Sequence, residues 1–229
     1  MPVLIVVAHP DDEVFGCGAT AAALAAQGIS VRSCILSSVA EARQHRPEIS
    51  DLLADTKEAN RILGLGEPIL GQFPNIAFNT VSNLTLVQFV EAAILETKAD
   101  VLFTHHPSDL NNDHLHTSLA CQCAARLFQR RPGLAPLKAL YYMEVLSSTD
   151  WSFPGASEPF RPDTFFEIGG YLERKLQALA AYRGVLRDFP HPRSNEIVRS
   201  LAAFRGGQSG MQHAEAFQTG FRSLNAVIA

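Results

Sequence analysis

Residues 3–13 read Val3-Leu4-Ile5-Val6-Val7-Ala8-His9-Pro10-Asp11-Asp12-Glu13, six apolar residues followed by a short polar turn. Four of the six apolar residues are β-branched, a pattern typical of a strand that is buried on both faces in a parallel sheet. The proline ends this strand, so one imidazole and three carboxylates follow at its carboxyl end. Ligand sites of open α/β sheets lie at that edge. The stretch therefore predicts a parallel sheet with a functional site directly after its first strand.

The polar turn has the residue types of a metal site. His9 and Asp12 are three residues apart, and Pro10 stiffens the turn between them, so the two side chains can converge on one divalent ion. Asp11 lies between them and need not bind the ion. A carboxylate in that position can accept a proton from water, which is the general-base role in hydrolysis.

A helix cap is the alternative interpretation of these acids. Asp is a favoured N-cap residue and Glu suits the first helical turn, and we expect a helix to begin near Val14 or Phe15. Capping alone is the weaker explanation for a whole cluster that directly follows an apolar strand. Both interpretations fit Glu13, which we expect at the helix terminus or behind the ligands.

The composition indicates a globular protein that does not bind nucleic acid. At 229 residues, 47% of them apolar and 18% charged, the chain fits a single domain, residues 1–229. Its net charge is −4 without a block of Lys or Arg, which argues against nucleic acid and anionic membranes as partners. The first apolar run is too short to span a bilayer and no basic region precedes it, so we expect a cytoplasmic protein without membrane insertion. The oligomeric state stays open, a homo-oligomer included.

Strands and helices alternate along the rest of the chain. Apolar runs predict strands at residues 29–37, 68–70, 99–104, 137–146 and 164–168, and helical periodicity predicts helices at residues 17–27, 50–63, 84–97, 114–130, 171–187 and 195–205. This alternation predicts an α/β fold, a Rossmann-like three-layer αβα sandwich with a mostly parallel sheet. Residues 15–20 loosely resemble a glycine-rich nucleotide loop, but they contain only two glycines and follow an acidic turn that would repel a pyrophosphate.

A second concentration of polar residues follows the strand predicted at residues 99–104. It reads His105-His106-Pro107-Ser108-Asp109-Leu110-Asn111-Asn112-Asp113-His114-Leu115-His116 and leads into the next helix. A lone histidine there would more often be a cap or a surface residue. Two polar clusters after two parallel strands favour a shared site instead, because the carboxyl ends of parallel strands meet at one edge of the sheet. His114 and His116 are two apart on a helix, so at most one of them should face that site.

Several polar loops are candidates for substrate binding. The polar run 41–48 leaves the same sheet edge as the first cluster, the segment 147–151 offers hydroxyls and an aromatic face that suit a sugar ring, and the loop 189–194 separates the last two helices. An ordinary solvated loop is the alternative at each of these places. The candidate substrate-binding residues are Arg43, His106, Ser148, Trp151, His191 and Arg193.

With both clusters in view, the sequence resembles the PIG-L/LmbE-like family of zinc-dependent de-N-acetylases. The resemblance rests on residues 8–13 and on Asn111-Asn112-Asp113-His114, and it extends over nearly the whole chain. It implies that the metal, Zn²⁺ or another divalent transition metal, is bound by His9, Asp12 and His114. It also implies that Asp11 is the general base and that Asp113 supports the ligands from behind.

One residue departs from the family pattern. Many relatives have a histidine where this chain has Asn111, so the usual imidazole that stabilises the oxyanion is absent at this position. Asn111, His106 or a group from elsewhere in the chain then has to take over that role. We include Asn111 among the catalytic candidates together with Asp11 and Asp113.

The resemblance implies a metal-dependent hydrolase that removes the acetyl group from an N-acetylated amino sugar, free, nucleotide-linked or glycosidic. An amide carbonyl is a poor electrophile, so a catalyst must both polarise it and activate water, and zinc with an open coordination position can do both. Two alternatives stay open. One is an amidase that acts on another sugar-linked amide, such as a thiol conjugate, and the other is a Rossmann-like nucleotide-binding protein without hydrolytic activity.

Overall fold

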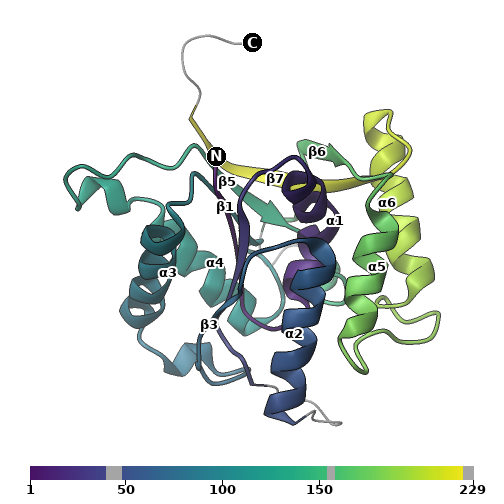
Figure 1. Ribbon diagram of the computed structural model, residues 1–229, viewed down its shortest axis with the longest axis horizontal. Helices are drawn as coiled ribbons and strands as arrows, with labels where there is room; N and C mark the ends of the chain where they lie inside the picture. The colour runs from purple at the N-terminus through teal and green to yellow at the C-terminus, as the bar shows by residue number, and fades with distance from the viewer. Residues whose placement is uncertain (40–47, 154–157, 224–229) are drawn as a thin grey trace.

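The computed structural model describes residues 1–39, 48–153 and 158–223, and a seven-stranded sheet forms its centre (Figure 1). The strand order is β3-β2-β1-β4-β5-β7-β6. The strands are β1 (Val3–Val7), β2 (Val31–Ile35), β3 (Ile69–Leu70), β4 (Val101–His105), β5 (Ala139–Met143), β6 (Thr164–Glu167) and β7 (Ala214–Arg222). The strands from β3 to β5 in this order pair in parallel, whereas β7 is antiparallel to both of its neighbours. The sheet is mostly parallel, which confirms the prediction.

Helices cover both faces of the sheet. They are α1 (Asp12–Ala26), α2 (Ile49–Leu63), α3 (Asn83–Thr97), α4 (Asn112–Ala124), α5 (Leu172–Ala181) and α6 (Asn195–Ser209), with short 3-10 turns η1 (Phe78–Thr80), η2 (Leu127–Gln129) and η3 (Thr149–Trp151). Helices α3 and α4 lie on one face, and α1, α2, α5 and α6 lie on the other (Figure 1). The fold is therefore the three-layer α/β sandwich that the alternating elements predict.

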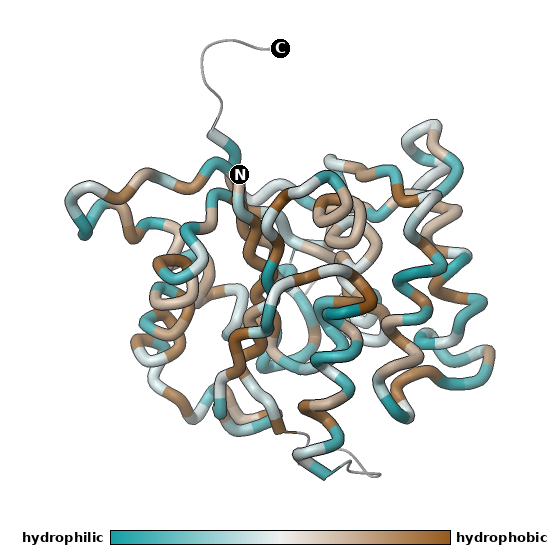
Figure 2. Tube along the Cα trace, viewed as in Figure 1, coloured by the Kyte–Doolittle hydropathy of each residue, from teal (hydrophilic) through white to brown (hydrophobic). Residues whose placement is uncertain are grey.

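Each face of the sheet has its own apolar core, and β1 contributes to both. Val3, Ile5 and Val7 pack on the side of α1 and α2, whereas Leu4 and Val6 pack on the side of α3 and α4. Figure 2 shows this concentration of hydrophobic residues along the central strands. Because successive side chains of a strand point to opposite faces, a strand buried on both sides has to be apolar throughout.

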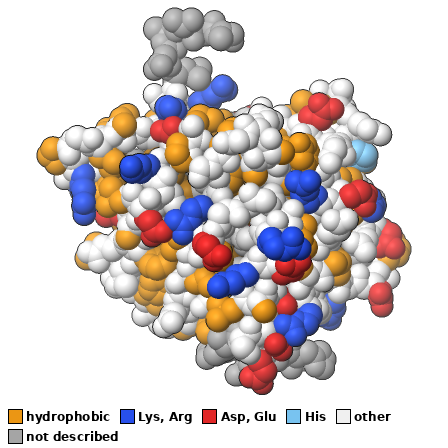
Figure 3. All heavy atoms as spheres, viewed as in Figure 1, with side chains coloured by type: hydrophobic (Ala, Val, Ile, Leu, Met, Phe, Trp, Pro, Cys, Tyr) orange, Lys and Arg blue, Asp and Glu red, His pale blue; other side chains and the backbone are white. Residues whose placement is uncertain are grey.

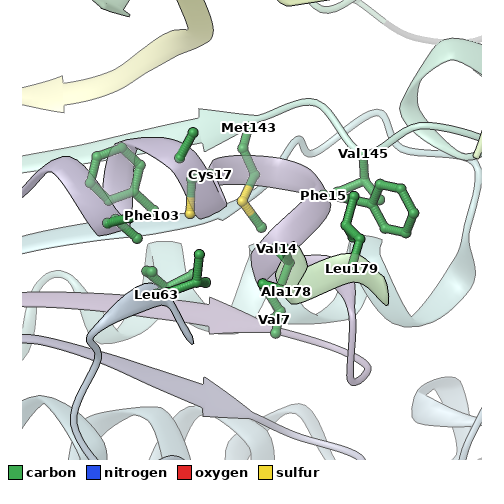
Figure 4. Close-up of a cluster of buried hydrophobic side chains, with 14 of the residues drawn as sticks. Val7, Val14, Phe15, Cys17, Leu63, Phe103, Met143, Val145, Ala178 and Leu179 are labelled. Carbon is green, nitrogen blue, oxygen red and sulfur yellow. The ribbon is translucent and has the colours of Figure 1, made fainter. Parts of the chain in front are cut away.

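Helix α1 begins inside the first motif and is kinked at Cys17 (φ −149°, ψ 22°). A buried ion pair holds the kink, with Lys175 Nζ 2.7 Å from Glu215 Oε1. Lys175 also donates to the carbonyl of Phe15 (2.7 Å), and Glu215 accepts from the amide of Thr20 (2.7 Å). Apolar side chains from β1, α1, α5 and the loop after β5 surround this region (Figure 4). Residues from α5 and β7 thus stabilise the helix that carries the first motif.

Strand β7 is not predicted from the sequence. Its residues 214–222 contain one β-branched side chain, Thr219, so the usual composition signal of a strand is weak. Tertiary contacts stabilise the strand instead, because β7 lies between β5 and β6 in the sheet and pairs with both. A Cβ at Gly220 would lie 2.7 Å from Tyr142 Cε2, so glycine permits this close approach.

Two predicted helices are also too long. The helix predicted at residues 114–130 starts two residues earlier and ends at Ala124, where the chain changes to the 3-10 turn η2. The helix predicted at residues 171–187 ends at Ala181, three residues before Gly184, which has a positive φ of 73°. In both cases the helical pattern of apolar residues continues past the last helical residue, into a segment that forms turns.

The surface carries charges of both signs. On the face shown in Figure 3, Lys and Arg side chains alternate with Asp and Glu without a patch of one sign. This mixture agrees with the net charge of −4. None of the helices in the described part of the chain has the length and apolar character needed to cross a membrane.

Candidate active site

The two polar clusters meet at the carboxyl edge of the sheet. Strands β1 and β4 are parallel neighbours, so the turn after β1 and the loop after β4 lie side by side. Candidate ligand atoms of His9, Asp12 and His114 all lie within 4.8 Å of one another, and all three residues are buried. Asp12 Oδ2 is 3.0 Å from His114 Nε2 and 3.4 Å from His9 Nδ1. The structure thus brings together the three residues that the sequence singles out as metal ligands.

Each histidine of this cluster has a carboxylate on its other ring nitrogen. Asp113 Oδ2 is 3.0 Å from His9 Nε2, and Asp109 Oδ2 is 3.2 Å from His114 Nδ1. In metal sites, a carboxylate at this position fixes the tautomer and the orientation of the ligating imidazole. His9 Nδ1, Asp12 Oδ2 and His114 Nε2 are then the atoms that face a common centre. Two nitrogens and one carboxylate oxygen are a donor set that suits zinc.

Asp109 is itself held in place by the loop after β5. It accepts hydrogen bonds from the hydroxyls of Ser148 and Thr149, the latter at 2.6 Å, and from the backbone amide of Asn111 at 2.9 Å. Ser148 Oγ also lies 3.3 Å from His114 Nδ1. Ser148, a predicted substrate contact, therefore lies behind the His114 ring and orients it together with Asp109.

A stacked histidine completes the surroundings of His114. His105, His114 and Asp109 form a second group that has candidate ligand atoms within 4.8 Å. His105 stacks on His114 with ring centroids 3.8 Å apart, and its Nε2 accepts from the amide of Ala8 at 2.9 Å. Burial lowers the pKa of His105 to about 3, so the ring is neutral. We favour the group with Asp12, because the oxygens of Asp109 already accept several hydrogen bonds.

The carboxylates shift the pKa values of the histidines beside them. Burial lowers the pKa of His114, but the Asp12 and Asp109 carboxylates outweigh burial and raise it to about 10. Burial raises the pKa of Asp109, but the His114 charge and hydrogen bond bring it down to about 2. Burial also lowers the pKa of His9, and hydrogen bonds with Asp113 and Asp12 produce a net rise. The cluster therefore favours positive charge, which a proton or a metal ion can supply.

Asp11 is the N-cap residue of α1, but its side chain does not cap the helix. It precedes α1 in a left-handed conformation (φ 97°), and its side chain makes no cap hydrogen bond to the helix. Its Oδ2 lies 3.2 Å from Arg193 Nη1. Arg193 is fixed in turn, because its Nε donates to Ser147 Oγ (2.8 Å) and its guanidinium lies 4.9 Å from the ring centroid of Phe15.

Glu13 points away from the cluster into the α1–α5 core. It accepts from the amide of Asp11 (3.1 Å) and from the hydroxyl of Tyr182 (2.5 Å). Burial raises the pKa of Glu13 to about 8. The residue supports the turn from behind, in agreement with one of the two places expected for it.

A pocket of about 200 Å³ opens above these groups. Of the predicted substrate contacts, Arg193 lines this pocket, and so does Asn111, a predicted catalytic residue. The side-chain oxygen of Asn111 accepts from the amide of Asp113 (2.9 Å), so the residue also caps α4. The complete lining is His9, Pro10, Asp11, Asp12, Val39, Asn75, Ile76, Asn111, His114 and Arg193.

The other predicted substrate contacts lie outside this lining. His106 pairs with Gln218 (3.1 Å). Trp151 is 53% exposed at the end of η3, and His191 accepts from the amide of Arg193 (3.0 Å) and thereby shapes the loop that carries this arginine. Arg43 lies outside the described residues.

Several residues of the site are not marked as functional by the sequence, among them Asp109, Ser147, Asn75 and Ile76. Asp109 belongs to the second polar cluster, and its position between the predicted strand and His114 is the sequence feature that could have indicated a role in the site. Ser147 reaches the site only through Arg193. Asn75 and Ile76 come from the segment before η1, which contains no motif and lies far from both clusters in the sequence.

Fold and site together define a class of α/β protein that carries a His-Asp-His cluster at the carboxyl edge of a mostly parallel sheet. The sequence matches the family described as PIG-L: GlcNAc-PI de-N-acetylase over residues 4–125, more than half of the chain. The chain belongs to this family, and it is a sugar de-N-acetylase by that membership. The matched residues include both polar clusters.

Individual similar proteins include two named as deacetylases and one named as a hydratase. The chain is 27% identical over 128 residues to the uncharacterized deacetylase YaiS of Escherichia coli (strain K12), covering 54% of this chain and 68% of the relative. The N,N'-diacetylchitobiose deacetylase from Pyrococcus horikoshii has a similar structure, with a TM-score of 0.75, 19% identity and coverage of 95% and 83%. GalB, the 4-carboxy-2-hydroxymuconate hydratase of Pseudomonas putida KT2440, has a TM-score of 0.78, 21% identity and full coverage of both chains. At these identities the two structures show the fold alone.

Proposed function

We propose that this protein is a zinc-dependent hydrolase that removes the acetyl group from a small N-acetylated amino sugar or sugar conjugate. The observation that carries the proposal is the geometry of the cluster. Both histidines offer one ring nitrogen to a common centre, and a buried carboxylate backs the other nitrogen. This arrangement is typical of catalytic metal sites, and the open pocket above it leaves room for a substrate.

In this proposal His9, Asp12 and His114 hold the zinc ion. A bound zinc ion supplies a Lewis acid that polarises the amide carbonyl and makes water more acidic. Asp11 accepts the proton of the attacking water, whose oxygen adds to the acyl carbon. The C–N bond then breaks, acetate leaves, and Asp11 returns the proton to the leaving amine. Arg193 keeps the Asp11 carboxylate turned toward the pocket through its contact at 3.2 Å.

Asn111 is our candidate for the group that stabilises the developing oxyanion. Its Oδ1 is occupied by the amide of Asp113, and this hydrogen bond fixes the plane of the side-chain amide at the pocket wall. We assign the donor role to its Nδ2. A side-chain amide in this role contributes on the order of 10²-fold to the rate.

The pocket suits a small substrate portion. Its volume of about 200 Å³ is below the range of about 300–1,000 Å³ that is common for drug-sized ligands. We infer that it takes one N-acetylated sugar ring and that any further part of the substrate lies outside. The P. horikoshii relative, a diacetylchitobiose deacetylase by name, suggests the kind of sugar to try first.

One alternative arises from the comparisons. The P. putida hydratase has the same fold over its full length, so the fold by itself is compatible with water addition to a carbon–carbon double bond. The family match and the E. coli relative favour amide hydrolysis. Metal content distinguishes the other alternative, a nucleotide-binding protein without hydrolytic activity, because such a protein would need no tightly held metal ion.

The test is acetate release by zinc-loaded protein from a panel of N-acetylated sugars, with metal content measured on the same preparation. We expect one zinc per chain and acetate from at least one sugar, with release at least about 10²-fold slower from the Asp11→Asn variant. A protein that holds no metal, or that holds zinc and releases no acetate from any member of the panel, contradicts the proposal.

A further inference from the structure

Unusual backbone conformations concentrate at the pocket. Among the residues that the structure describes, four residues other than glycine have positive φ: Asp11 (97°), Ile76 (56°), Lys98 (54°) and Ser147 (69°). Lys98 ends helix α3, where a left-handed residue is ordinary. The other three belong to the site, since Asp11 and Ile76 line the pocket and Ser147 accepts from the pocket arginine. Strained residues that persist at a site point to a role for the strain.

Ile76 is the most unfavourable of these residues. A β-branched side chain clashes with its own backbone in the left-handed region, where Asp is tolerated far better. The side chain gains no core burial in return, because it is 48% exposed. Its conformation therefore needs an external cause.

Asp113 provides that cause. Its Oδ2 accepts from the amide of Ile76 (2.6 Å), and its Oδ1 accepts from the amide of Phe78 (2.9 Å). The same Oδ2 contacts His9 Nε2 at 3.0 Å. Phe78 is fully buried, with its ring centroid 6.2 Å from that of His9. One carboxylate thus ties the segment 76–78 to a metal-ligand histidine, which keeps Ile76 close to the reacting centre.

The chemistry of the pocket indicates what Ile76 contacts. Most of the lining is polar, and its apolar side chains are Pro10, Val39 and Ile76. Sugar hydroxyls need polar partners such as Arg193 and Asn111, and they gain nothing from an aliphatic wall. The methyl of an acetyl group is the apolar part of the substrate, and it is bonded directly to the reacting carbonyl carbon.

We propose that Ile76 is a specificity-determining residue that contacts the acyl methyl and limits the acyl group to acetyl, an inference that rests on the proposed function. Asp113 positions it by accepting from its amide, and the residue lines the pocket without being buried in the core. A longer acyl chain would collide with the Ile76 side chain, whereas truncation at this position would make room for it.

The experiment compares N-acetyl and N-propionyl forms of the sugar that the zinc-loaded wild type hydrolyses best. We expect Ile76→Ala to raise the propionyl-to-acetyl ratio of kcat/KM about tenfold, since one methylene in an apolar pocket changes selectivity by roughly 10–200-fold. Metal content should stay at the wild-type value. Lys98→Ala removes a long side chain from the remote left-handed position and should leave the ratio unchanged.

A stability comparison tests the strain independently of activity. Alanine is normally the more stabilising of the two residues, but at positive φ glycine is preferred. We therefore expect a higher Tm for Ile76→Gly than for Ile76→Ala, and the same order for Lys98→Gly and Lys98→Ala. Only the Ile76 variants should change acyl selectivity.

Three outcomes contradict the inference and can be told apart. If the wild type hydrolyses the N-acetyl sugar but Ile76→Ala keeps the wild-type acyl ratio, Ile76 does not set specificity and the proposed function stands. If the zinc-loaded wild type releases no acyl group from any sugar, the proposed function fails and this inference fails with it. An Ile76→Gly variant less stable than Ile76→Ala would contradict the strained conformation.

Discussion

The turn after β1 and the loop after β4 contribute in different ways to one site. The β1 turn offers two candidate ligands and the candidate base within four residues, His9 to Asp12. The segment after β4, here called the β4 loop, comprises residues 106–114, of which the last three begin α4. It offers one candidate ligand, His114, and two carboxylates that orient the histidines. Asp109 acts within its own loop, whereas Asp113 reaches across to the β1 turn. The comparison indicates that one loop supplies most of the reactive groups and the other holds them in place.

The anchoring of the two loops differs as well. Helix α1, which follows the β1 turn, is fixed by the buried pair of Lys175 and Glu215 from distant parts of the chain. The β4 loop is fixed by two hydroxyls of a neighbouring loop, Ser148 and Thr149, which bind Asp109. A buried ion pair thus stabilises the helix after the β1 turn, whereas hydroxyl hydrogen bonds to a carboxylate stabilise the β4 loop.

The adjacent acids of the β1 turn should give the largest effects. Asp12→Asn replaces an anionic donor by a neutral amide, so metal affinity and activity should fall together. Asp11→Asn keeps size and polarity but cannot accept the proton of water, so the protein should hold one metal while turnover falls by about 10²-fold or more. The measurement is metal stoichiometry beside acetate release for each variant.

Added zinc separates the two roles. It should restore part of the activity of Asp12→Asn and none of the activity of Asp11→Asn. If Asp11→Asn is the variant that loses the metal, while Asp12→Asn retains it, then Asp11 is the ligand and Asp12 the base, and our assignment is wrong.

The anchor of the β1 turn should matter next. Lys175→Met leaves the buried Glu215 carboxylate without its counter-ion, and loss of one partner of a buried pair costs about 3 kcal/mol of folding free energy. Urea unfolding measures this loss. Arg199→Met is the matched control, because it breaks the exposed pair with Glu173 and should change stability little. Equal losses of unfolding free energy for the two substitutions would show that the buried pair stabilises the fold no more than the exposed pair.

The two supporting carboxylates of the β4 loop should give smaller, distinguishable effects. Asp109→Asn and Asp113→Asn should each weaken zinc binding by about 10–100-fold, the usual effect of losing a carboxylate behind a metal-bound histidine. Asp113→Asn should also alter acyl selectivity, because Asp113 holds Ile76 as well as His9. Competition with a chelator measures the affinity. An Asp109→Asn variant with altered acyl selectivity would contradict the separation of roles.

The features that the sequence predicts are local ones. The apolar run of β1 and its polar turn specify a strand and its site within eleven residues, and the second cluster lies on one loop. The support of His114 by Ser148 and the wall formed by Ile76 depend on contacts between distant segments, so no motif marks them. The sequence does not mark strand β7 for the same reason, because pairing with β5 and β6 makes this segment a strand while its own composition does not.

A residue of the β4 loop outside the pocket should give the smallest effect. Burial lowers the pKa of His106 from 6.5, despite its hydrogen bond to Gln218 and the charge of Asp109. Its ring contacts Tyr142 and Phe160, with centroids 5.7 and 5.5 Å away. The unfolded chain therefore binds the His106 proton more readily than the folded one, so the stability contributed by the neutral ring is present above pH 6.5 and is lost as the pH falls through the lowered pKa. His106→Gln keeps a polar side chain without this titration, so the Tm difference between wild type and variant should shrink between pH 7.5 and pH 5.5. A difference that grows toward acid pH would mean that the folded protein prefers the charged ring.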